Sequence, residues 1–217
     1  MSKSLHVTKI GHCCLLIKIK GVTILTDPGM FSSDQDNIVG IDIVLITHEH
    51  ADHLHVDSLR QILKNNPKVK VFTNQSVKAI LDKESISSSV IPAGELIKVL
   101  NIEIQSFDGK HAEIFEVIGQ VENSGFLVDN SFFYPGDSYT EPGVPVNVLA
   151  LPVAGPWCKI SDAINYALKV KPQNAFPVHD GQLQKGREGA NHAVVKKVLD
   201  ENNIKFSIIT DGESVTL

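Results

Sequence analysis

Ionisable side chains are concentrated in one short segment, ITHEHADHLH, which runs from Ile46 to His55 and follows the apolar run IDIVL. Neutral imidazole nitrogens and carboxylate oxygens are good ligands for zinc, manganese or iron. His48 and His50 are close enough in the chain for both imidazoles to reach one ion from an irregular loop. Asp52 and His53 can face a second ion beside the first. The spacing therefore indicates a metal site at the end of a strand.

Two other interpretations of this segment have to be weighed. The pair His48-Glu49 begins the single-zinc motif H-E-x-x-H, but that motif needs a histidine where the chain has Asp52. The second interpretation, a histidine-rich loop in solvent, does not explain why four histidines gather at a strand end. Clustered ligand types at this spacing favour the metal site.

Three later residues could complete the ligand set, because each follows an expected strand. His111 comes after IEIQSF, Asp137 after SFFYP, and His179 directly after NAFPV. In open α/β sheets, ligands bind beyond the carboxyl ends of the strands. Gly136 allows a sharp turn before Asp137. Each residue alone could be structural, but their shared position makes them candidate ligands.

Strands dominate the expected secondary structure, and helices occur singly between them. Strands are expected at 5–10, 13–19, 22–27, 41–47, 68–73, 88–92, 102–107, 124–129, 131–135, 146–152, 174–178, 206–210 and 214–217. Helices are expected at 56–65, 74–83 (with Asn74 as the cap), 161–170 and 190–202. The two halves of the chain share this rhythm. We therefore expect an α/β protein of four layers, an αββα sandwich, with residues 1–217 forming a single domain.

Composition narrows the classes of partner. The 217 residues carry a net charge of −5 without a long basic run, so nucleic acid is not an expected partner. The first twenty-one residues lack an apolar stretch long enough for a signal peptide or a membrane span. Cys13, Cys14 and Cys158 do not form a disulfide framework and are expected to be packing residues. We expect a cytoplasmic protein that does not bind membranes.

The complete sequence His48-Glu49-His50-Ala51-Asp52-His53 resembles the first signature, H-x-H-x-D-H, of the metallo-β-lactamase-fold superfamily. His111, Asp137 and His179 match the later metal positions of that superfamily in order. The segment KIGHCCLLIKIKGVTILTDP, with Gly11-His12, is similar to metal-dependent hydrolases related to ascorbate-phosphate lactonase, as are LPVAGPW and SDAINYALKVKPQNAFPVH. The resemblance spans essentially the whole chain. The chain departs from that branch near its end, where PVHDGQLQKGREGANH follows no substrate signature.

The resemblance implies two divalent metal ions per chain, with zinc expected and manganese or iron as alternatives. It assigns the first ion to His48, His50 and His111, the second to Asp52, His53 and His179, and a bridging position to Asp137. Two such ions can share a water and make hydroxide available at neutral pH. Asp52 would be the catalytic residue that orients this hydroxide and accepts its proton. Asp27 is a candidate partner behind the ligands.

The expected function is hydrolysis of a small ester, lactone, amide or phosphorylated metabolite by a binuclear metal centre. The alternatives are a phosphodiesterase, or a metal-binding or regulatory protein without hydrolytic activity on the same scaffold. Candidate substrate-binding residues are His12, Trp157, Lys185 and Arg187. The alternative for His12 is a structural histidine, and the alternative for Trp157 is core packing. An arginine can bind phosphate or carboxylate with two hydrogen bonds, so an anionic small molecule is expected. The alternative for Lys185 and Arg187 is two solvated charges, and self-association of the chain is left open.

Overall fold

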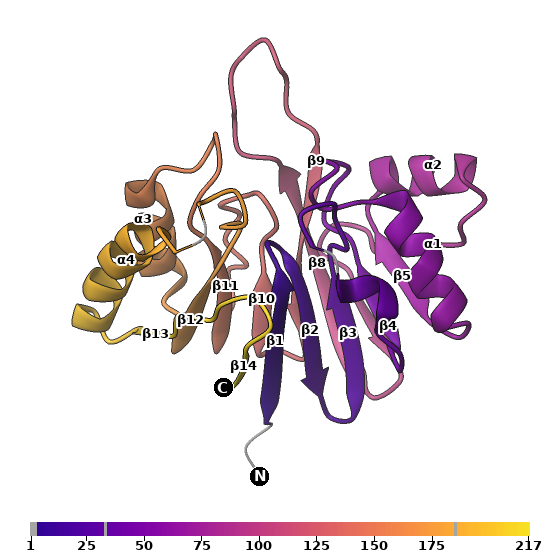
Figure 1. The fold of residues 1–217 in the computed structure, drawn as a ribbon, viewed down its shortest axis with the longest axis horizontal. Coiled ribbons are helices and arrows are strands. Elements are labelled where there is room, and N and C mark those ends of the chain that lie inside the picture. The colour runs from indigo at the N-terminus through magenta and orange to yellow at the C-terminus, as the bar shows by residue number, and fades with distance from the viewer. Residues whose placement is uncertain (1–3, 33, 185) are drawn as a thin grey trace.

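The computed structural model describes residues 4–32, 34–184 and 186–217. Two sheets of seven strands lie face to face in it (Figure 1). The first sheet has the order β14 (Ser214–Thr216), β1 (Leu5–Gly11), β2 (Cys14–Ile19), β3 (Val22–Thr26), β4 (Ile43–Leu45), β5 (Lys70–Thr73) and β6 (Ser89–Val90). The second has the order β13 (Lys205–Phe206), β12 (Asn174–Val178), β11 (Val148–Pro152), β10 (Phe132–Tyr134), β9 (Glu122–Val128), β8 (Ile102–Lys110) and β7 (Leu96–Val99).

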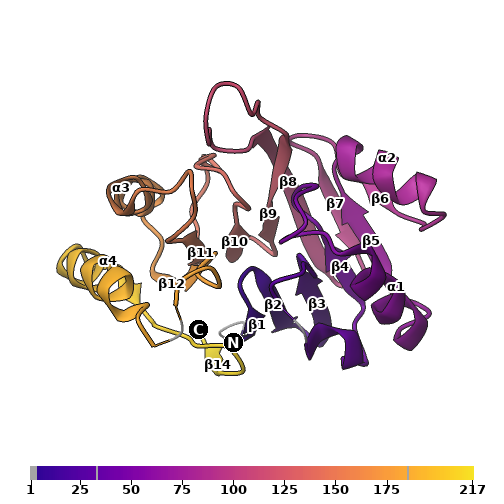
Figure 2. The same ribbon diagram turned by 45° about the horizontal axis from the view of Figure 1, so that its top comes forward.

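Helices cover the outer face of each sheet (Figure 2). The helices are α1 (Val56–Asn65) and α2 (Gln75–Lys83) on the first sheet, and α3 (Ile160–Val170) and α4 (Gly189–Glu201) on the second. Leu59 of α1 packs in the same apolar cluster as Val44 of β4, and Ala163 of α3 packs in one with Leu149 of β11. The four-layer αββα sandwich expected from the sequence is therefore confirmed.

The main core lies between the two sheets and contains the inward side chains of both. In β1, for example, Leu5 and Val7 point into this core while His6 is exposed, as the alternation of a strand requires. Lys9 continues the inward series and is fully buried, although it is charged. An unusual buried charge thus lies on the inner face of the first sheet.

Parallel strands order the end of the molecule where the candidate ligands lie. β3, β4 and β5 run parallel in the first sheet, as do β10, β11 and β12 in the second. Their carboxyl ends carry the loops with His48, Asp137 and His179. The sandwich thus brings loops from both sheets to one end, as the strand-end argument predicts.

Several expected elements differ in extent from those observed. β7 and a short 3-10 helix, η1 (Asp34–Asn37), were not expected. β7 was missed because it is an edge strand whose side chains are mostly exposed or partly exposed. The expected strand at 206–210 contributes only Phe206, because β13 pairs with only the first two residues of β12. The helix-capping prediction is confirmed, since the Asn74 side chain accepts a hydrogen bond from the backbone N–H of Val77 at 3.0 Å.

No helix in the described ranges is both long and apolar enough to span a bilayer. Cys13, Cys14 and Cys158 are free thiols. The cytoplasmic location and the single-domain organisation remain predictions.

Candidate metal centre

The loop after β4 presents four of the candidate ligands in a compact turn. The backbone N–H groups of His53 and Leu54 both donate to the carbonyl of His50, at 2.9 and 2.8 Å. Gly29, in the loop after β3, lies against this turn so closely that a Cβ there would overlap the backbone of Asp52. The conformation of the ligand loop is thus fixed by its own hydrogen bonds and by a neighbouring loop.

His48, His50 and His111 form the first ligand group. One ring nitrogen from each lies within 4.8 Å of the others. Nε2 of His48 is 3.2 Å from Nδ1 of His50. His111 follows β8 in the second sheet, so the group joins both halves of the fold. Three imidazoles facing one point are the donor set that divalent transition metals prefer.

Asp137 lies at the centre of the cluster. Its Oδ1 is 3.2 Å from Nε2 of His53, and its Oδ2 is 3.2 Å from Nε2 of His111 and 2.8 Å from Nε2 of His179. Oδ2 is also 3.8 Å from Nε2 of His48. One carboxylate thus contacts histidines of both expected groups, as a bridging ligand would.

Asp52, His53 and His179 form the second expected group. Oδ2 of Asp52 lies 3.9 Å from Nε2 of His53 and 3.6 Å from Nε2 of His179. Ring nitrogens of His12, His53 and His179 also gather with the thiol of Cys13 within 4.8 Å. Cys13 was expected only as a packing residue, and burial, followed by the charge of Asp137, raises the pKa of its thiol far above the ordinary value. Because a bound metal ion can itself deprotonate a thiol, Cys13 stands beside the carboxylate and imidazole groups as a further candidate donor.

Unsatisfied polar atoms support the fit of a metal to these residues. Nε2 of His53, Oδ1 of Asp137 and Nδ1 of His179 are buried and find no hydrogen-bond partner among the described residues. Buried polar atoms normally have such partners, and orphaned ones need an explanation such as an ion. Nε2 of His53 and Oδ1 of Asp137 lie 3.2 Å apart without the alignment of a hydrogen bond. Converging donors that do not satisfy one another are the arrangement that ligands of a common ion adopt.

The charges of the cluster are unevenly distributed. Burial, reinforced by the neighbouring His53, holds the pKa of His48 well below its usual value. Burial opposes ionisation of Asp137, but His53 and His179 keep its pKa well below the ordinary range. Burial likewise opposes a charge on His53, yet the carboxylates of Asp137 and Asp27 hold its pKa well above normal. Asp137 is therefore ionised and His48 neutral, which are the metal-binding forms.

Asp27 supports the second group from behind. Its carboxylate accepts from Nδ1 of His53 and from the hydroxyl of Thr47, both at 2.7 Å, and from the hydroxyl of Tyr134. Because Nδ1 of His53 faces Asp27, Nε2 of His53 is turned toward Asp137. The expectation that Asp27 lies behind the ligands is met by these contacts. A carboxylate behind a ligand imidazole orients the ring and raises its basicity.

The ring of His12 is held in one tautomer. The backbone N–H of Gly181 donates to Nδ1 of His12 at 3.1 Å, so the proton of the neutral ring sits on Nε2. Nε2 lies 3.2 Å from Oδ2 of Asp52 and donates to it. His12 is almost fully buried. The contact of His12 with Asp52 therefore lies in the interior of the protein. The expected role of His12 in substrate binding remains a prediction.

Trp157 forms a wall of the cluster. Its ring centroid lies 5.6 Å from that of His111 and 5.4 Å from that of His179. Its indole Nε1–H donates to Oδ2 of Asp137 at 3.1 Å. Trp157 thus packs between the two ligand groups and holds the central carboxylate, while its contact with a substrate remains a prediction.

The two expected anion-binding residues are placed differently. Arg187 is exposed, and its backbone N–H donates to the carbonyl of Gln184. Lys185 lies outside the described residues. The anionic substrate therefore remains a prediction.

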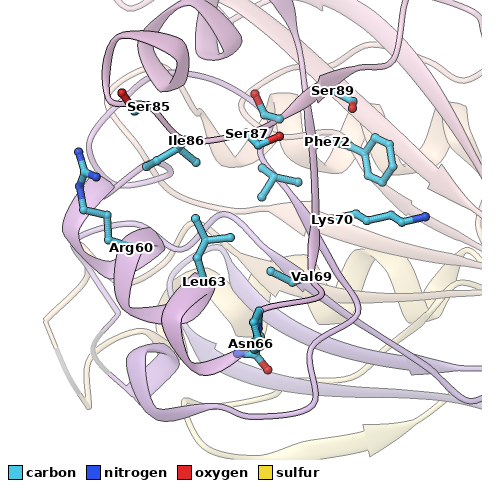
Figure 3. A pocket seen from close by; sticks show the side chains of 13 residues that line it. Arg60, Leu63, Asn66, Val69, Lys70, Phe72, Ser85, Ile86, Ser87 and Ser89 are labelled. Atoms are coloured by element: carbon cyan, nitrogen blue, oxygen red, sulfur yellow. The ribbon is translucent and has the colours of Figure 1, made fainter.

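A hollow of about 570 Å³ lies away from the cluster, between α1, β5 and the edge strand β6. Arg60, Lys70 and several serines line it (Figure 3). None of its lining residues is a candidate ligand, so it does not belong to the metal centre.

Two features of the centre were not expected from the sequence. Asn123 holds the turn before Asp137, since its Oδ1 accepts the backbone N–H of Asp137 at 3.0 Å. His12, Asp27 and His179 have φ angles of 48, 36 and 61°, which non-glycine residues seldom adopt. Such strain collects at functional sites. The sequence signal for this backbone strain is limited to the composition of the loops, which are rich in His and Asp.

Comparison with known proteins places this chain in a family. Residues 6–179 match the model of the beta-lactamase superfamily domain. The chain is 30% identical to Protein Rv0786c of Mycobacterium tuberculosis, over 98% of this chain and 100% of that protein. It is 26% identical to a UPF0173 metal-dependent hydrolase of Pyrococcus furiosus, over 97% and 99% of the two chains. Among solved structures, Igni18, a metallo hydrolase from the archaeon Ignicoccus hospitalis, matches with a TM-score of 0.77 at 20% identity, covering 99% of this chain and 98% of that one.

The two sequence relatives match this chain over nearly its whole extent, and Igni18 shares the fold described above. The resemblance drawn from the residues His48 to His53 is thereby confirmed at the level of the superfamily, while the branch related to ascorbate-phosphate lactonase remains a prediction. This chain belongs to the metallo-β-lactamase superfamily.

Proposed function

We propose that this protein is a metal-dependent hydrolase that binds two divalent ions, with zinc as the expected metal. The observation that supports this most directly is the position of Asp137. Its two oxygens lie against histidines of both ligand groups. A carboxylate between two sets of donors suits a pair of ions, and the names of relatives as metal-dependent hydrolases agree with the proposal.

Held by the two ligand groups and Asp137, two such ions would lower the pKa of bound water to near neutral and would polarise the carbonyl or phosphoryl oxygen of a substrate. Asp52 is the most exposed of the candidate carboxylates, with 16% of its side chain accessible. Burial raises its pKa, but the hydrogen bond from His12 and the charges of His53 and His179 outweigh this and hold it low. Asp52 is therefore ionised at working pH and can orient a water and pass on its proton.

His12 and Trp157 contribute by fixing these carboxylates. His12 donates from Nε2 to Asp52, and Trp157 donates from Nε1 to Asp137. Each removes a rotational freedom from a ligand before the substrate arrives. Preorganised groups of this kind lower the barrier because they need no rearrangement during the reaction.

Elemental analysis of protein purified without chelator, combined with activity measurements, tests the proposal. We expect two transition-metal ions per chain, and turnover of at least one compound in a panel of lactones, thioesters, amides and phosphodiesters. Removal of the ions should abolish turnover, and zinc or manganese should restore it. Hydrolysis restricted to phosphodiesters would select the alternative of a phosphodiesterase. Two bound ions without turnover would favour a metal-binding or regulatory role.

Asp137→Ala and His55→Ala form the matched pair for this test. Asp137 contacts both ligand groups, so its loss should remove at least one ion and most activity while the fold is retained. His55 lies just beyond the motif and contacts Ser58 of α1, with 3.0 Å between Nδ1 and Oγ. His55→Ala should bind two ions as the parent does. Equal metal content and activity in the two variants would overturn the ligand assignment.

A further inference from the structure

Two loops near the candidate metal centre expose large apolar side chains. In loop 112–121, which joins β8 to β9, Phe115 is 58% exposed, Val117 80% and Ile118 61%. In the loop after β3, Met30 is 55% exposed and Phe31 45%. Exposed apolar surface beside a candidate site commonly marks a binding surface. We call these five residues the apolar rim.

Loop 112–121 is attached to the metal ligands at its base. The backbone N–H of His111 donates to the carbonyl of Val121 at 3.0 Å, which closes the loop. The N–H of Ala112 donates to the carbonyl of Asp137 at 2.7 Å. From this base the loop rises above the strand ends before it returns to β9 (Figures 1 and 2). Its apolar tip therefore stands on the side of the first ligand group.

The loop after β3 approaches the second ligand group. The ring of Phe31 packs edge-on against His12, with 5.3 Å between centroids, and His12 contacts Asp52. The backbone N–H of Met30 donates to the carbonyl of Ala51, next to Asp52, at 2.9 Å. The exposed parts of Met30 and Phe31 thus stand on the side of the second group. The apolar rim flanks the ligand cluster on both sides.

We infer that the apolar rim binds the hydrocarbon or aromatic part of the substrate, so that the substrate class is a neutral ester, lactone or amide with an apolar substituent. This inference rests on the proposed hydrolytic function and specifies its substrate. A bond held over the ligand cluster would extend its substituents toward one or both loops. Burial of apolar surface there supplies binding energy away from the bond that breaks.

The charges of loop 112–121 argue for a neutral substrate. The loop carries Glu113 and Glu116 beside its apolar tip, and the chain has a net charge of −5. These carboxylates would repel a phosphorylated or carboxylated compound. The inference therefore competes with the anionic substrate expected from Arg187, which is exposed in the loop after β12.

The same carboxylates make other occupants less suitable. Anionic lipids would be repelled by Glu113 and Glu116, whereas surfaces that bind such membranes carry lysine and arginine. A second copy of the chain, packed through the same loop about a twofold axis, would bring like charges together. A neutral apolar group is the occupant that meets the exposed side chains without meeting a charge of the same sign.

Binding of straight-chain hydroxamic acids to the metal-loaded protein tests the inference without requiring turnover. The hydroxamate group chelates the ions, and its alkyl tail reports on the surroundings of the centre. We expect the affinity to rise roughly two- to fourfold with each added methylene, from acetohydroxamic to decanohydroxamic acid, since a fully buried methylene contributes about fourfold. The triple variant Phe115→Ser, Val117→Ser, Ile118→Ser should lose most of this dependence and keep the parent's affinity for acetohydroxamic acid.

Single substitutions provide a matched control. Val117→Ser should weaken binding of the long hydroxamates, whereas Leu100→Ser should not. Leu100 is 59% exposed in the turn between β7 and β8, at the opposite end of β8 from loop 112–121. The two variants remove similar exposed apolar surface, so only position distinguishes them.

Each alternative predicts a different result. Affinity independent of chain length, with acetohydroxamic acid still bound, overturns the inference and leaves the metal centre intact. If the metal-loaded protein binds none of the hydroxamic acids, acetohydroxamic acid included, both the inference and the proposed metal centre are overturned. Tighter binding of a tail that ends in a carboxylate, together with a higher KM for anionic substrates in Arg187→Ala, establishes the anionic class instead. A triple variant with unchanged chain-length dependence that alters sedimentation or vesicle binding assigns the loop to a second copy or to lipid.

Discussion

Replacing Lys9 by methionine should destabilise the fold more than the loss of an exposed charge does. Lys9 lies on the inner face of β1, and its ammonium donates to Oδ1 of Asp180. Nε2 of His192, in α4, lies 3.0 Å from Oδ2 of the same carboxylate. All three side chains are almost fully buried. Methionine fills a similar volume but leaves the buried carboxylate with one partner in place of two.

The cost follows from that uncompensated charge. Removing one partner of a buried ion pair lowers the free energy of unfolding by about 3–5 kcal/mol. Because Asp180 keeps its contact with His192, we expect Lys9→Met to cost about 3 kcal/mol. For a chain of this size, that loss lowers Tm by about 6–12 °C. Burial opposes ionisation of Asp180, but His192 and Lys9 hold its pKa below the ordinary value. The pair therefore stabilises the fold above about pH 4, and the cost of Lys9→Met should shrink as acid protonates Asp180.

Urea unfolding of the metal-free protein at several pH values measures this cost. The double variant Lys9→Met, Asp180→Asn should be more stable than Lys9→Met alone, because the buried charge is removed with its partner. Lys78→Met is the control, since Lys78 pairs with Asp82 on the surface of α2 at 2.7 Å and should cost about 0.5 kcal/mol or less. If Lys9→Met costs no more than Lys78→Met, or if the double variant shows no coupling, the reasoning is refuted.

Three further predictions concern the metal centre. Gly29→Ala should displace the ligand loop and reduce the metal content, because a Cβ would overlap the backbone of Asp52. Trp157→Phe removes a hydrogen bond to the ionised Asp137, so metal affinity should fall about ten- to hundredfold. Because Asp137 and Asp27 raise the pKa of His53 well above its usual value, we expect both of its ring nitrogens to be protonated at neutral pH in the metal-free protein. Binding of the second ion should release one proton, and its affinity should rise about tenfold for each unit of rising pH. Calorimetry in buffers of different ionisation enthalpy measures the proton release.

Each of these predictions has a control on the same chain. Gly189→Ala should keep the full metal content, since nothing lies within 4 Å of a Cβ at that position. Tyr139→Phe removes a hydroxyl that makes no hydrogen bond to Asp137, so it should leave metal affinity near that of the parent. Identical metal content in Gly29→Ala and Gly189→Ala, or metal uptake without proton release, would contradict the corresponding argument.

The layer order was predictable from the sequence because it depends on local periodicity. The helix of α1 repeats its apolar residues at helical spacing, and its observed bounds equal the expected ones. β7 escaped prediction because it pairs only with β8, and three of its four residues are at least partly exposed. An edge strand of this kind has no apolar alternation, and only its hairpin partner stabilises it. The length of a strand that is set by pairing across a sheet cannot be predicted from the sequence of that strand alone.

The candidate ligands could be predicted from the sequence because metal binding requires particular residue types and the ends of strands fix their position. The residues that hold these ligands in place could not be predicted in the same way. Lys9 occupies the third inward position of β1, after Leu5 and Val7, and that alternation alone could have indicated a buried lysine. Its partner Asp180 comes from the far end of the chain, so nothing local to Lys9 identifies it. Contacts between distant segments remain hidden until the sheets are assembled.

The backbone at the second ligand group shows why such distant contacts matter. His12 and His179 both have left-handed φ angles, which side chains with a Cβ adopt at an energetic cost. Each conformation is held by the other segment, since the N–H of His179 donates to the carbonyl of His12 and the N–H of Gly181 donates to Nδ1 of His12. Neither loop would keep this shape alone. Because Asp180 lies between His179 and Gly181, its contacts with Lys9 and His192 fix the segment that carries the ligand. The strain at His179 is therefore sustained by the packing of β1 and α4, and the second metal position depends on contacts outside the ligand set.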